Sequence, residues 1–426
     1  MGKNKPKIYF PQNWIIWFVS ALFVFLQFGL QLSSGEILSG LMKSFSLTTF
    51  GAGLLTSSYY YIYVSLQTPV GLLMDFHGPR KLLSVGALMC CAGCFVFAQS
   101  TWVEFAALGR IMMGTGAAFA FVGSITLVSR WFPPEKFSFM LGIVEAIGML
   151  SGLLMGVSVA HVVENFGWRA SMWGAGLIAV SLSLLIWLIV RDFPKSISPH
   201  VSPTTFPWRD MKYILKNPCS WYNGLFSGMM FSLISTFSVL WSIPFFMHVY
   251  HFQLGTAALC GNFIFVGLVM GCPIVGWIDH RTHHRKILMP IYALAAGIFL
   301  SAIIYLPLSL VSILICMTLL GLFASSYILS FAIGHELATP STKSAAIGFV
   351  NTLSVGLTPI FQPLIGYLLW VFSKNAHNDT HSYHLAFAVF PILLLIAALI
   401  ARWIPERKNY STSSRIRALR PLKSRK

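Results

Sequence analysis

Long apolar stretches alternate with short polar connections along almost the whole chain. A helix of about 20 apolar residues crosses the roughly 30 Å hydrocarbon core of a bilayer and satisfies its own backbone hydrogen bonds. The pattern predicts twelve such helices and therefore an all-α, multi-pass membrane protein. The predicted segments are 13–35, 50–73, 82–99, 103–127, 137–162, 168–190, 221–248, 255–278, 287–306, 308–334, 343–371 and 385–404.

The longest polar interruption falls in the middle of the chain. Residues 192–219 contain five prolines among Ser, Thr and Lys, a composition typical of a linker. The chain is therefore predicted to consist of a basic cytoplasmic leader, a six-helix bundle, this cytoplasmic linker, a second six-helix bundle and a basic cytoplasmic tail, with the boundaries 1–12, 13–191, 192–219, 220–404 and 405–426.

The composition excludes a soluble protein. Hydrophobic residues make up 56% of the chain and charged residues 10%, whereas soluble domains carry about 25% charged residues. The net charge of +17 does not indicate nucleic-acid binding, because the basic residues stand in short connections between apolar runs. Most of the seven cysteines lie in apolar runs without a histidine at ligand spacing, so we expect no metal site and no cofactor.

The basic residues also predict the orientation. With the N-terminus in the cytoplasm, twenty-five of the 29 Lys and Arg lie on the inner side and three on the outer side. Cytoplasmic connections of membrane proteins are enriched in Lys and Arg. We therefore expect both termini in the cytoplasm and a multi-pass position in the bacterial inner membrane.

The two halves of the chain repeat each other. Asp75 recurs as Asp279 at an offset of 204, each six residues after a proline and each followed by a basic cluster. Glu145 and Asn351 occupy matching positions at an offset of 206. Two nearly equal offsets indicate duplication. Duplicated halves of a twelve-helix protein are typical of carriers whose two bundles rock about a central cavity.

Two motifs resemble those of the major facilitator superfamily. The segment from Gly71 to Lys81 is similar to the family's signature between helices 2 and 3, and Arg110 with Gly114 resembles its helix-4 motif. Phe76 replaces the usual basic residue after the aspartate, and helix 5 lacks the Gly-Pro pair of drug/proton antiporters. The resemblance extends over almost the whole chain. It implies two six-helix bundles that transport a solute by alternating access.

Charged residues at the cytoplasmic helix ends are candidates for a gate. Asp75 can accept hydrogen bonds from neighbouring helix ends in one state of the transport cycle and release them in the other. A simple topology anchor is the alternative, because cytoplasmic loops are basic in any case. The repeat at Asp279 favours gating, and the complete candidate set is Asp75, Arg80, Lys81, Asp279 and Arg281.

Arg110 and Glu145 stand well inside predicted segments. A charge at such a depth costs about 2.5–3.5 kcal/mol and needs a partner or water. We expect Arg110 to bind a carboxylate of the substrate or to pair with Glu145, and we expect Glu145 to carry the coupling proton. An internal ion pair that only fixes packing is the alternative.

Polar side chains inside the helices are further candidates for the substrate site. Tyr59 and Tyr63 share a helix face, as do Gln27 and Gln31, because each pair is four residues apart. Hydrogen bonding between helices is the alternative for each of them. The candidates for the cavity wall are Gln27, Gln31, Tyr59, Tyr60, Tyr63, Gln67, Ser235, Thr236, Asn262, Asn351 and Gln362.

The sequence contains no phosphate-binding loop, nucleophile set or metal motif, so ATP-driven pumping and enzymatic activity are not expected. It predicts a secondary-active transporter for a small polar, carboxylate-bearing solute such as an amino acid, a small peptide or an organic acid, driven by its own gradient or by proton symport. An efflux carrier for amphipathic compounds and a non-transporting sensor on the same fold are the alternatives. The expected partners are the substrate, protons and the lipid bilayer, and the protein is expected to act as a monomer.

Overall fold

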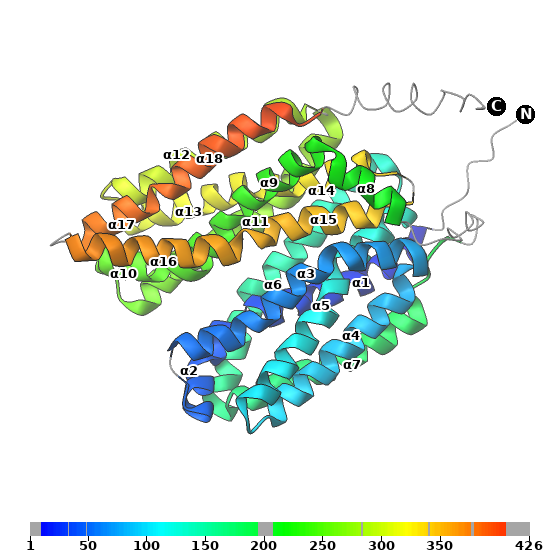
Figure 1. Ribbon diagram of the computed structural model, residues 1–426, viewed down its shortest axis with the longest axis horizontal. Coiled ribbons are helices and arrows are strands. Elements are labelled where there is room, and N and C mark those ends of the chain that lie inside the picture. The colour runs from blue at the N-terminus through cyan, green and yellow to red at the C-terminus, as the bar shows by residue number, and fades with distance from the viewer. Residues whose placement is uncertain are drawn as a thin grey trace, which may run out of the picture.

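The computed structural model describes residues 10–32, 34–47, 49–194, 208–282, 284–339, 341–375 and 379–405. Within these ranges every regular element is a helix. Figure 1 shows the helices as two groups that lie side by side, one formed by the chain before the linker and one by the chain after it. The predicted leader up to residue 9, the linker from 195 to 207 and the tail from 406 onward lie outside the described residues.

The first group, here called the first half, extends from α1 to α7. A tight turn separates α3 from α4, and Gly78 in this turn has a φ of +82°, which glycine adopts without steric cost. A Cβ at Gly78 would also lie 2.8 Å from the carboxyl group of Asp192. The elements are α1 (Phe10–Leu32), α2 (Ser34–Phe45), α3 (Thr49–His77), α4 (Pro79–Gln99), α5 (Val103–Trp131), η1 (Pro134–Lys136), α6 (Phe137–Phe166) and α7 (Trp168–Ile189).

The second half follows the linker helix α8 (Trp208–Lys216). Two of its membrane-crossing paths contain irregular turns: the π-helical η2 between α9 and α10, and the 3₁₀ turn η3 between α13 and α14. Such π-helical turns occur frequently at functional sites. The elements are α9 (Pro218–Ser232), η2 (Leu233–Trp241), α10 (Ser242–His248), α11 (Leu254–Thr282), α12 (Arg285–Tyr305), α13 (Leu310–Ala324), η3 (Ser325–Ile328), α14 (Leu329–Leu337), α15 (Lys343–Gly356), α16 (Thr358–Asn375), α17 (Asp379–Phe387), α18 (Val389–Ile400) and η4 (Ala401–Trp403).

The described residues contain eleven helical segments that are long and apolar enough to cross a membrane. This result confirms a multi-pass membrane protein. The predicted segment 50–73 forms α3 but is not among the eleven, because its Ser, Thr, Tyr and Gln residues lower its hydropathy. With 29 residues, α3 is about 43 Å long and can still span the bilayer. The count of twelve therefore stays a prediction that depends on α3.

Two repeat-related glycines bring the halves into backbone contact. A Cβ at Gly142 of α6 would collide with the carbonyl oxygen of Cys272 in α11. A Cβ at Gly348 of α15 would collide in the same way with the carbonyl oxygen of Gln67 in α3. These glycines hold matching positions in the two halves, three residues before Glu145 and Asn351. The duplication therefore supplies two equivalent contacts, α6 with α11 and α15 with α3.

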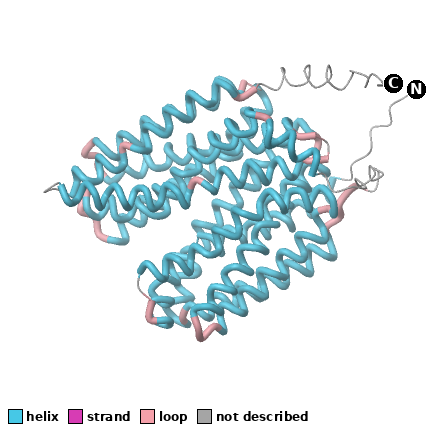
Figure 2. Tube along the Cα trace, viewed as in Figure 1, coloured by secondary structure: helices cyan, strands magenta, loops and turns pink. Residues whose placement is uncertain are grey.

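The start of α1, helix α8 and η4 lie at one end of the bundle, which we call the linker end (right in Figure 1). The opposite end is called the far end. Figure 2 shows that the turns between helices gather at these two ends. Met211 and Ile214 of α8 form a buried cluster with Leu72 of α3 and Ala345 of α15. The linker helix therefore packs against both halves where they meet.

Candidate functional site

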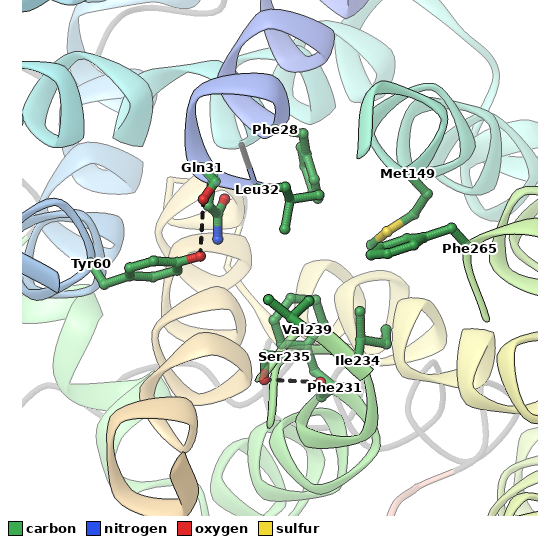
Figure 3. A pocket seen from close by; sticks show the side chains of 10 residues that line it. All are labelled: Phe28, Gln31, Leu32, Tyr60, Met149, Phe231, Ile234, Ser235, Val239 and Phe265. Carbon is green, nitrogen blue, oxygen red and sulfur yellow. Dashed lines mark hydrogen bonds between the residues drawn. The ribbon is translucent and has the colours of Figure 1, made fainter. Parts of the chain in front are cut away.

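A small pocket lies between the two halves near the middle of the bundle (Figure 3). It measures about 10 Å³, room for about one water molecule. Five lining residues come from each half: Phe28, Gln31, Leu32, Tyr60 and Met149 from the first, and Phe231, Ile234, Ser235, Val239 and Phe265 from the second. A space bounded equally by both halves changes shape whenever the halves move relative to each other.

Helices α1 and α3 position the polar side chains of the first half. The side-chain amide of Gln27 donates to Oε1 of Gln31 at 2.6 Å. The hydroxyl group of Tyr60 donates to the backbone oxygen of Gln31 at 3.2 Å, the bond drawn in Figure 3. Tyr59 donates in the same way to the backbone oxygen of Gln27 at 3.5 Å. Of these four residues, Gln31 and Tyr60 line the pocket, whereas Gln27 binds Gln31 and the ring of Tyr59 contacts that of Tyr60.

Arg110 lies inside the first half, next to these tyrosines. Its side chain is 1% exposed. Its guanidinium group donates to the backbone oxygen of Thr56 at 3.1 Å and lies 5.1 Å from the ring centroid of Tyr59. The ring of Tyr59 in turn contacts that of the pocket residue Tyr60, with 5.7 Å between the ring centroids. Arg110 therefore places a positive charge one side chain away from the pocket without lining the pocket itself.

Glu145 of α6 contacts the other half. Its Oε1 accepts a hydrogen bond of 2.7 Å from the hydroxyl group of Tyr327 in η3. The second oxygen, Oε2, is buried and has no hydrogen-bond partner among the described residues. Glu145 therefore does not pair with Arg110 in this structure. Tyr327 was not predicted, although the Ser-Ser-Tyr run inside the segment 308–334 marks it as a polar interruption.

The repeat partner of Glu145 also reaches across to the other half. The side-chain amide of Asn351 in α15 donates to the hydroxyl oxygen of Tyr63 at 3.3 Å and to Oε1 of Gln67 at 2.9 Å. The ring of Tyr63 stacks on that of Tyr59 with 5.9 Å between the ring centroids. The structure thus joins Asn351 to the predicted tyrosine face of α3. Equivalent positions of the two halves both bind residues of the opposite half.

Asp75 closes the linker end from the first half. Its two carboxylate oxygens accept hydrogen bonds of 3.1 and 3.0 Å from the backbone N–H groups of Ser344 and Ala345. These residues stand in the first turn of α15, where a helix leaves N–H groups without partners and favours negative charge. Arg130 reinforces the region by donating to the backbone oxygen of Met74 at 3.2 Å.

Asp279 forms the corresponding contact in the second half. It accepts hydrogen bonds of 2.6 and 2.8 Å from the guanidinium group of Arg285 and one of 2.5 Å from Ser138, at the start of α6 in the first half. Glu336 binds the other side of the same guanidinium group at 2.7 and 3.1 Å. Arg285 is 1% exposed, and two carboxylates surround it. Both aspartates of the repeat therefore contact the first turn of a helix in the opposite half.

Hydrogen bonds close to the linker end complete the closure. Thr68 of α3 bonds to Thr352 of α15 at 2.9 Å, and Thr126 of α5 donates to Ser344 at 2.8 Å. Together with the two aspartate contacts, they hold the halves together on the linker side of the pocket. The structure is therefore closed between the pocket and the linker end.

The sequence profile of the Major Facilitator Superfamily matches residues 14–355. The chain belongs to this superfamily. It is 24% identical over 417 residues to the uncharacterized transporter YybO of Bacillus subtilis, a match that spans 89% of this chain and 92% of that protein. It is 23% identical to the chloroplastic ascorbate transporter of Arabidopsis thaliana (92% and 74%) and 23% identical to the probable sulfoacetate transporter SauU of Cupriavidus necator (85% and 86%).

Solved structures of the superfamily share the fold. A bacterial homolog of the human lysosomal transporter Spinster, in an inward-facing and unoccupied conformation, matches with a TM-score of 0.67 and 15% identity over 92% of this chain and 97% of that one. The fucose:proton symporter FucP of E. coli matches with a TM-score of 0.64 and 17% identity over 91% and 99%. These relatives are transporters and not enzymes, so this superfamily member is a membrane transporter.

Some of the site residues predicted from the sequence line the pocket, and others do not. Asn262 of α11 is exposed and does not line the pocket, although it stands three residues before the lining residue Phe265 and shares its helix face. Ser235, a candidate from the sequence, does line the pocket. Within the described ranges no group of three His, Cys, Asp or Glu side chains is arranged to hold a metal ion.

The predicted gate cations and the two gate aspartates have different partners. Arg80 donates to the backbone oxygen of Trp187 at the end of α7, Lys81 is exposed, and Arg281 lies 5.0 Å from the ring centroid of Trp277. The cation that binds Asp279 is Arg285, which the prediction left out of the gate. The gating roles of Arg80, Lys81 and Arg281 stay predictions, and the aspartates form the contacts that join the halves.

Proposed function

We propose that this protein is a secondary-active carrier for a small polar solute with a carboxylate group, which it moves by alternating access. The observation that carries the proposal is the pocket shared equally by the two halves, with Gln31 and Tyr60 on its wall and the positive charge of Arg110 next to Tyr59, whose ring contacts that of Tyr60. Opening the far end exposes the pocket to one side of the membrane. Breaking the aspartate contacts at the linker end exposes it to the other.

The charge of Arg110 favours an anionic substrate. A buried guanidinium group next to donors such as the Tyr60 hydroxyl and the Gln31 amide attracts a carboxylate more strongly than a neutral solute. Two of the relatives are named for ascorbate and sulfoacetate, which are both organic anions. Their names support an anion as the cargo of this chain.

We propose that Glu145 couples transport to protons. Its carboxyl group lies between the halves and, among the described residues, is hydrogen-bonded through one oxygen, to Tyr327 of the opposite half. A buried carboxylate needs a proton, a cation or water. Opening the linker end separates Glu145 from Tyr327 and admits water, which allows a proton to leave. The structural relative FucP is named a proton symporter, which supports the same energy source.

We place the linker end in the cytoplasm of a bacterial inner membrane, with twelve spans and a monomer as the functional unit. The support is the excess of basic residues that the topology puts on this side. On this assignment the contacts of Asp75 and Asp279 form a closed cytoplasmic gate, and the structure represents a state closed on the cytoplasmic side.

Proton flux into proteoliposomes tests the coupling. Pools of organic acids, amino acids and dipeptides are added to vesicles that contain the protein and a pH-sensitive dye. We expect one pool to start proton flux with the parent protein but not with Glu145→Gln, while Glu145→Gln still exchanges labelled substrate across the membrane. Proton-driven accumulation by Glu145→Gln at the parent rate would contradict the role of Glu145.

A further inference from the structure

We propose that the substrate carries an apolar body, an aromatic ring or a branched alkyl group, in addition to its carboxylate. This inference rests on the proposed function, because it assigns a substrate class to the same pocket. The argument comes from the side chains around the pocket and from how they are distributed over its walls.

Polar side chains occupy one side of the pocket, here called the polar wall, and apolar side chains make up the rest of the lining, here called the apolar wall. Among its ten lining residues only Gln31, Tyr60 and Ser235 carry polar side-chain atoms. Figure 3 shows these three on the left of the pocket, with Met149 and Phe265 on the right. Arg110 lies against the ring of Tyr59, which contacts the ring of Tyr60, and so places a positive charge on the side of the polar wall. A ligand between these walls is held by its anionic group on one side and by its carbon skeleton on the other.

The apolar wall selects against strongly hydrated anions. Phe28 and Met149 belong to the first half, and Phe231 and Phe265 to the second, and none of the four is extensively exposed. An anion that is polar on all sides, such as phosphate, loses water on this wall without gaining a hydrogen bond, which is costly. A ring or a branched chain gains from the same contact. The wall therefore favours solutes with a polar end and an apolar end.

The side chains of the apolar wall can make room for a larger group. The pocket holds about one water molecule in this state, so a ring must displace side chains to enter. Met149 has an unbranched, adaptable side chain. The apolar lining residues Ile234 and Val239 stand in the π-helical turn η2, whose hydrogen bonds differ from those of a regular helix. Both features allow the wall to adapt to an apolar group.

Exchange of labelled benzoate in proteoliposomes tests the inference with the full-length protein. Vesicles are loaded with unlabelled benzoate, 3-methylbutanoate, acetate or phosphate, and uptake of external labelled benzoate is measured. We expect benzoate and 3-methylbutanoate to drive exchange with a half-saturating concentration at least about tenfold below that of acetate, because one missing apolar group costs about 10-fold or more in such a pocket. If acetate or phosphate drives exchange at the same half-saturating concentration as benzoate, the inference is wrong. The protein would then still be an anion carrier, as proposed above.

Two further outcomes separate the inference from the proposed function. If cyclohexanol, which lacks a carboxylate, competes as well as benzoate, the apolar site stands but the requirement for an anion is wrong. If the folded protein exchanges none of these compounds but another pool starts proton flux, the inference is wrong and the proposed function stands. If no pool starts proton flux either, the proposed function is wrong as well. Folding is checked by the melting curve of the same preparation.

A pair of phenylalanine variants on one helix links the selectivity to the pocket. Phe265→Ala is expected to raise the half-saturating concentration of benzoate about tenfold while that of acetate stays the same. Phe263→Ala is the matched control, because Phe263 is partly buried on α11 and does not line the pocket. Phe265→Leu retains much of the volume and is expected to lie between the parent and Phe265→Ala. Equal effects of Phe265→Ala and Phe263→Ala on benzoate would contradict the assignment of the apolar wall.

Discussion

At the scale of single residues, the contribution of a charged side chain to stability depends on its burial and its partner more than on its place in the sequence. Arg285 is enclosed by Asp279 and Glu336, whereas Arg281, four residues earlier, is exposed and packs on Trp277. Breaking a buried ion pair leaves a charge without compensation and costs about 3–5 kcal/mol. Changing an exposed cation usually alters stability by less than about 0.5 kcal/mol.

We therefore expect Arg285→Gln to lower the melting temperature of the purified protein clearly and Arg281→Gln to leave it almost unchanged. The reason is that Gln cannot neutralise the two carboxylates that remain at position 285. Thermal unfolding in detergent, followed by intrinsic fluorescence, compares the two variants under one condition. Similar melting temperatures for both would mean that water or another cation replaces Arg285.

Sequence reasoning found one side of most contacts at this scale but not the other. Asp75 and Glu145 stand out because each is a charge inside or next to a repeated segment. Their partners do not stand out, because Ser344 and Ala345 act through backbone N–H groups and Tyr327 is one tyrosine among many. Asn351 is the exception, because its partners Tyr63 and Gln67 are candidates from the sequence as well. Contacts between helices about 200 residues or more apart depend on packing that no local pattern contains.

At the scale of elements, the repeat-related glycines decide how closely the halves approach. Gly142 of α6 faces the backbone of α11 with no space for a methyl group. Gly174 of α7 also lies in a helix, but a Cβ there would meet nothing within 4 Å. The same substitution at the two positions therefore separates the effect of contact from that of helix propensity, which favours Ala over Gly by about 1 kcal/mol.

We expect Gly142→Ala to loosen the closed linker end and Gly174→Ala to leave it intact. A methyl group between α6 and α11 pushes the halves apart, and the N–H groups of Ser344 and Ala345 then lose Asp75 as an acceptor for part of the time. Hydrogen–deuterium exchange of the peptide containing these residues is expected to be several-fold faster in Gly142→Ala. Unchanged exchange would show that the helices absorb the methyl group locally.

The elements themselves were largely predictable from hydropathy. The predicted apolar runs correspond to helices of the structure, since each helix must cover its backbone with apolar side chains. The polar face of α3 lowered its hydropathy, so the same tyrosines that indicated a site made the span harder to identify. The π-helical turn η2 was not predicted, because hydropathy does not reveal which hydrogen bonds a helix makes.

At the scale of the whole molecule, the contacts at the linker end predict from which side of the membrane a solute can reach the pocket. Asn262 is exposed on the helix face of Phe265, whereas Thr352 is hydrogen-bonded between the halves at the linker end. A membrane-impermeant thiol reagent added from the far side is therefore expected to label Asn262→Cys at least tenfold faster than Thr352→Cys. The parent chain gives the background from its own cysteines, and Cys260 nearby is fully buried.

The same labelling tests the orientation. In vesicles with the cytoplasmic face inside, external reagent is expected to reach Asn262→Cys, because the far end then faces outward. Labelling of Asn262→Cys only from the inside would reverse the assignment of the linker end to the cytoplasm. Equal labelling of both variants from one side would show that the closed linker end is a minor state.

The contact of Asp75 has a consequence for how freely the gate can vary. Two of its partners are main-chain amides, which every residue except proline provides, so this part of the attraction does not depend on which side chains stand at positions 344 and 345. Substitutions of Ala345 are limited by the space beside Gly71 and not by the chemistry of recognition, whereas Ser344 also accepts a hydrogen bond from Thr126 through its hydroxyl group. Proline is the exception: the first turn of a helix accepts it, but it removes the donor. A proline at position 344 or 345 would therefore weaken the contact with Asp75 and still keep the helix.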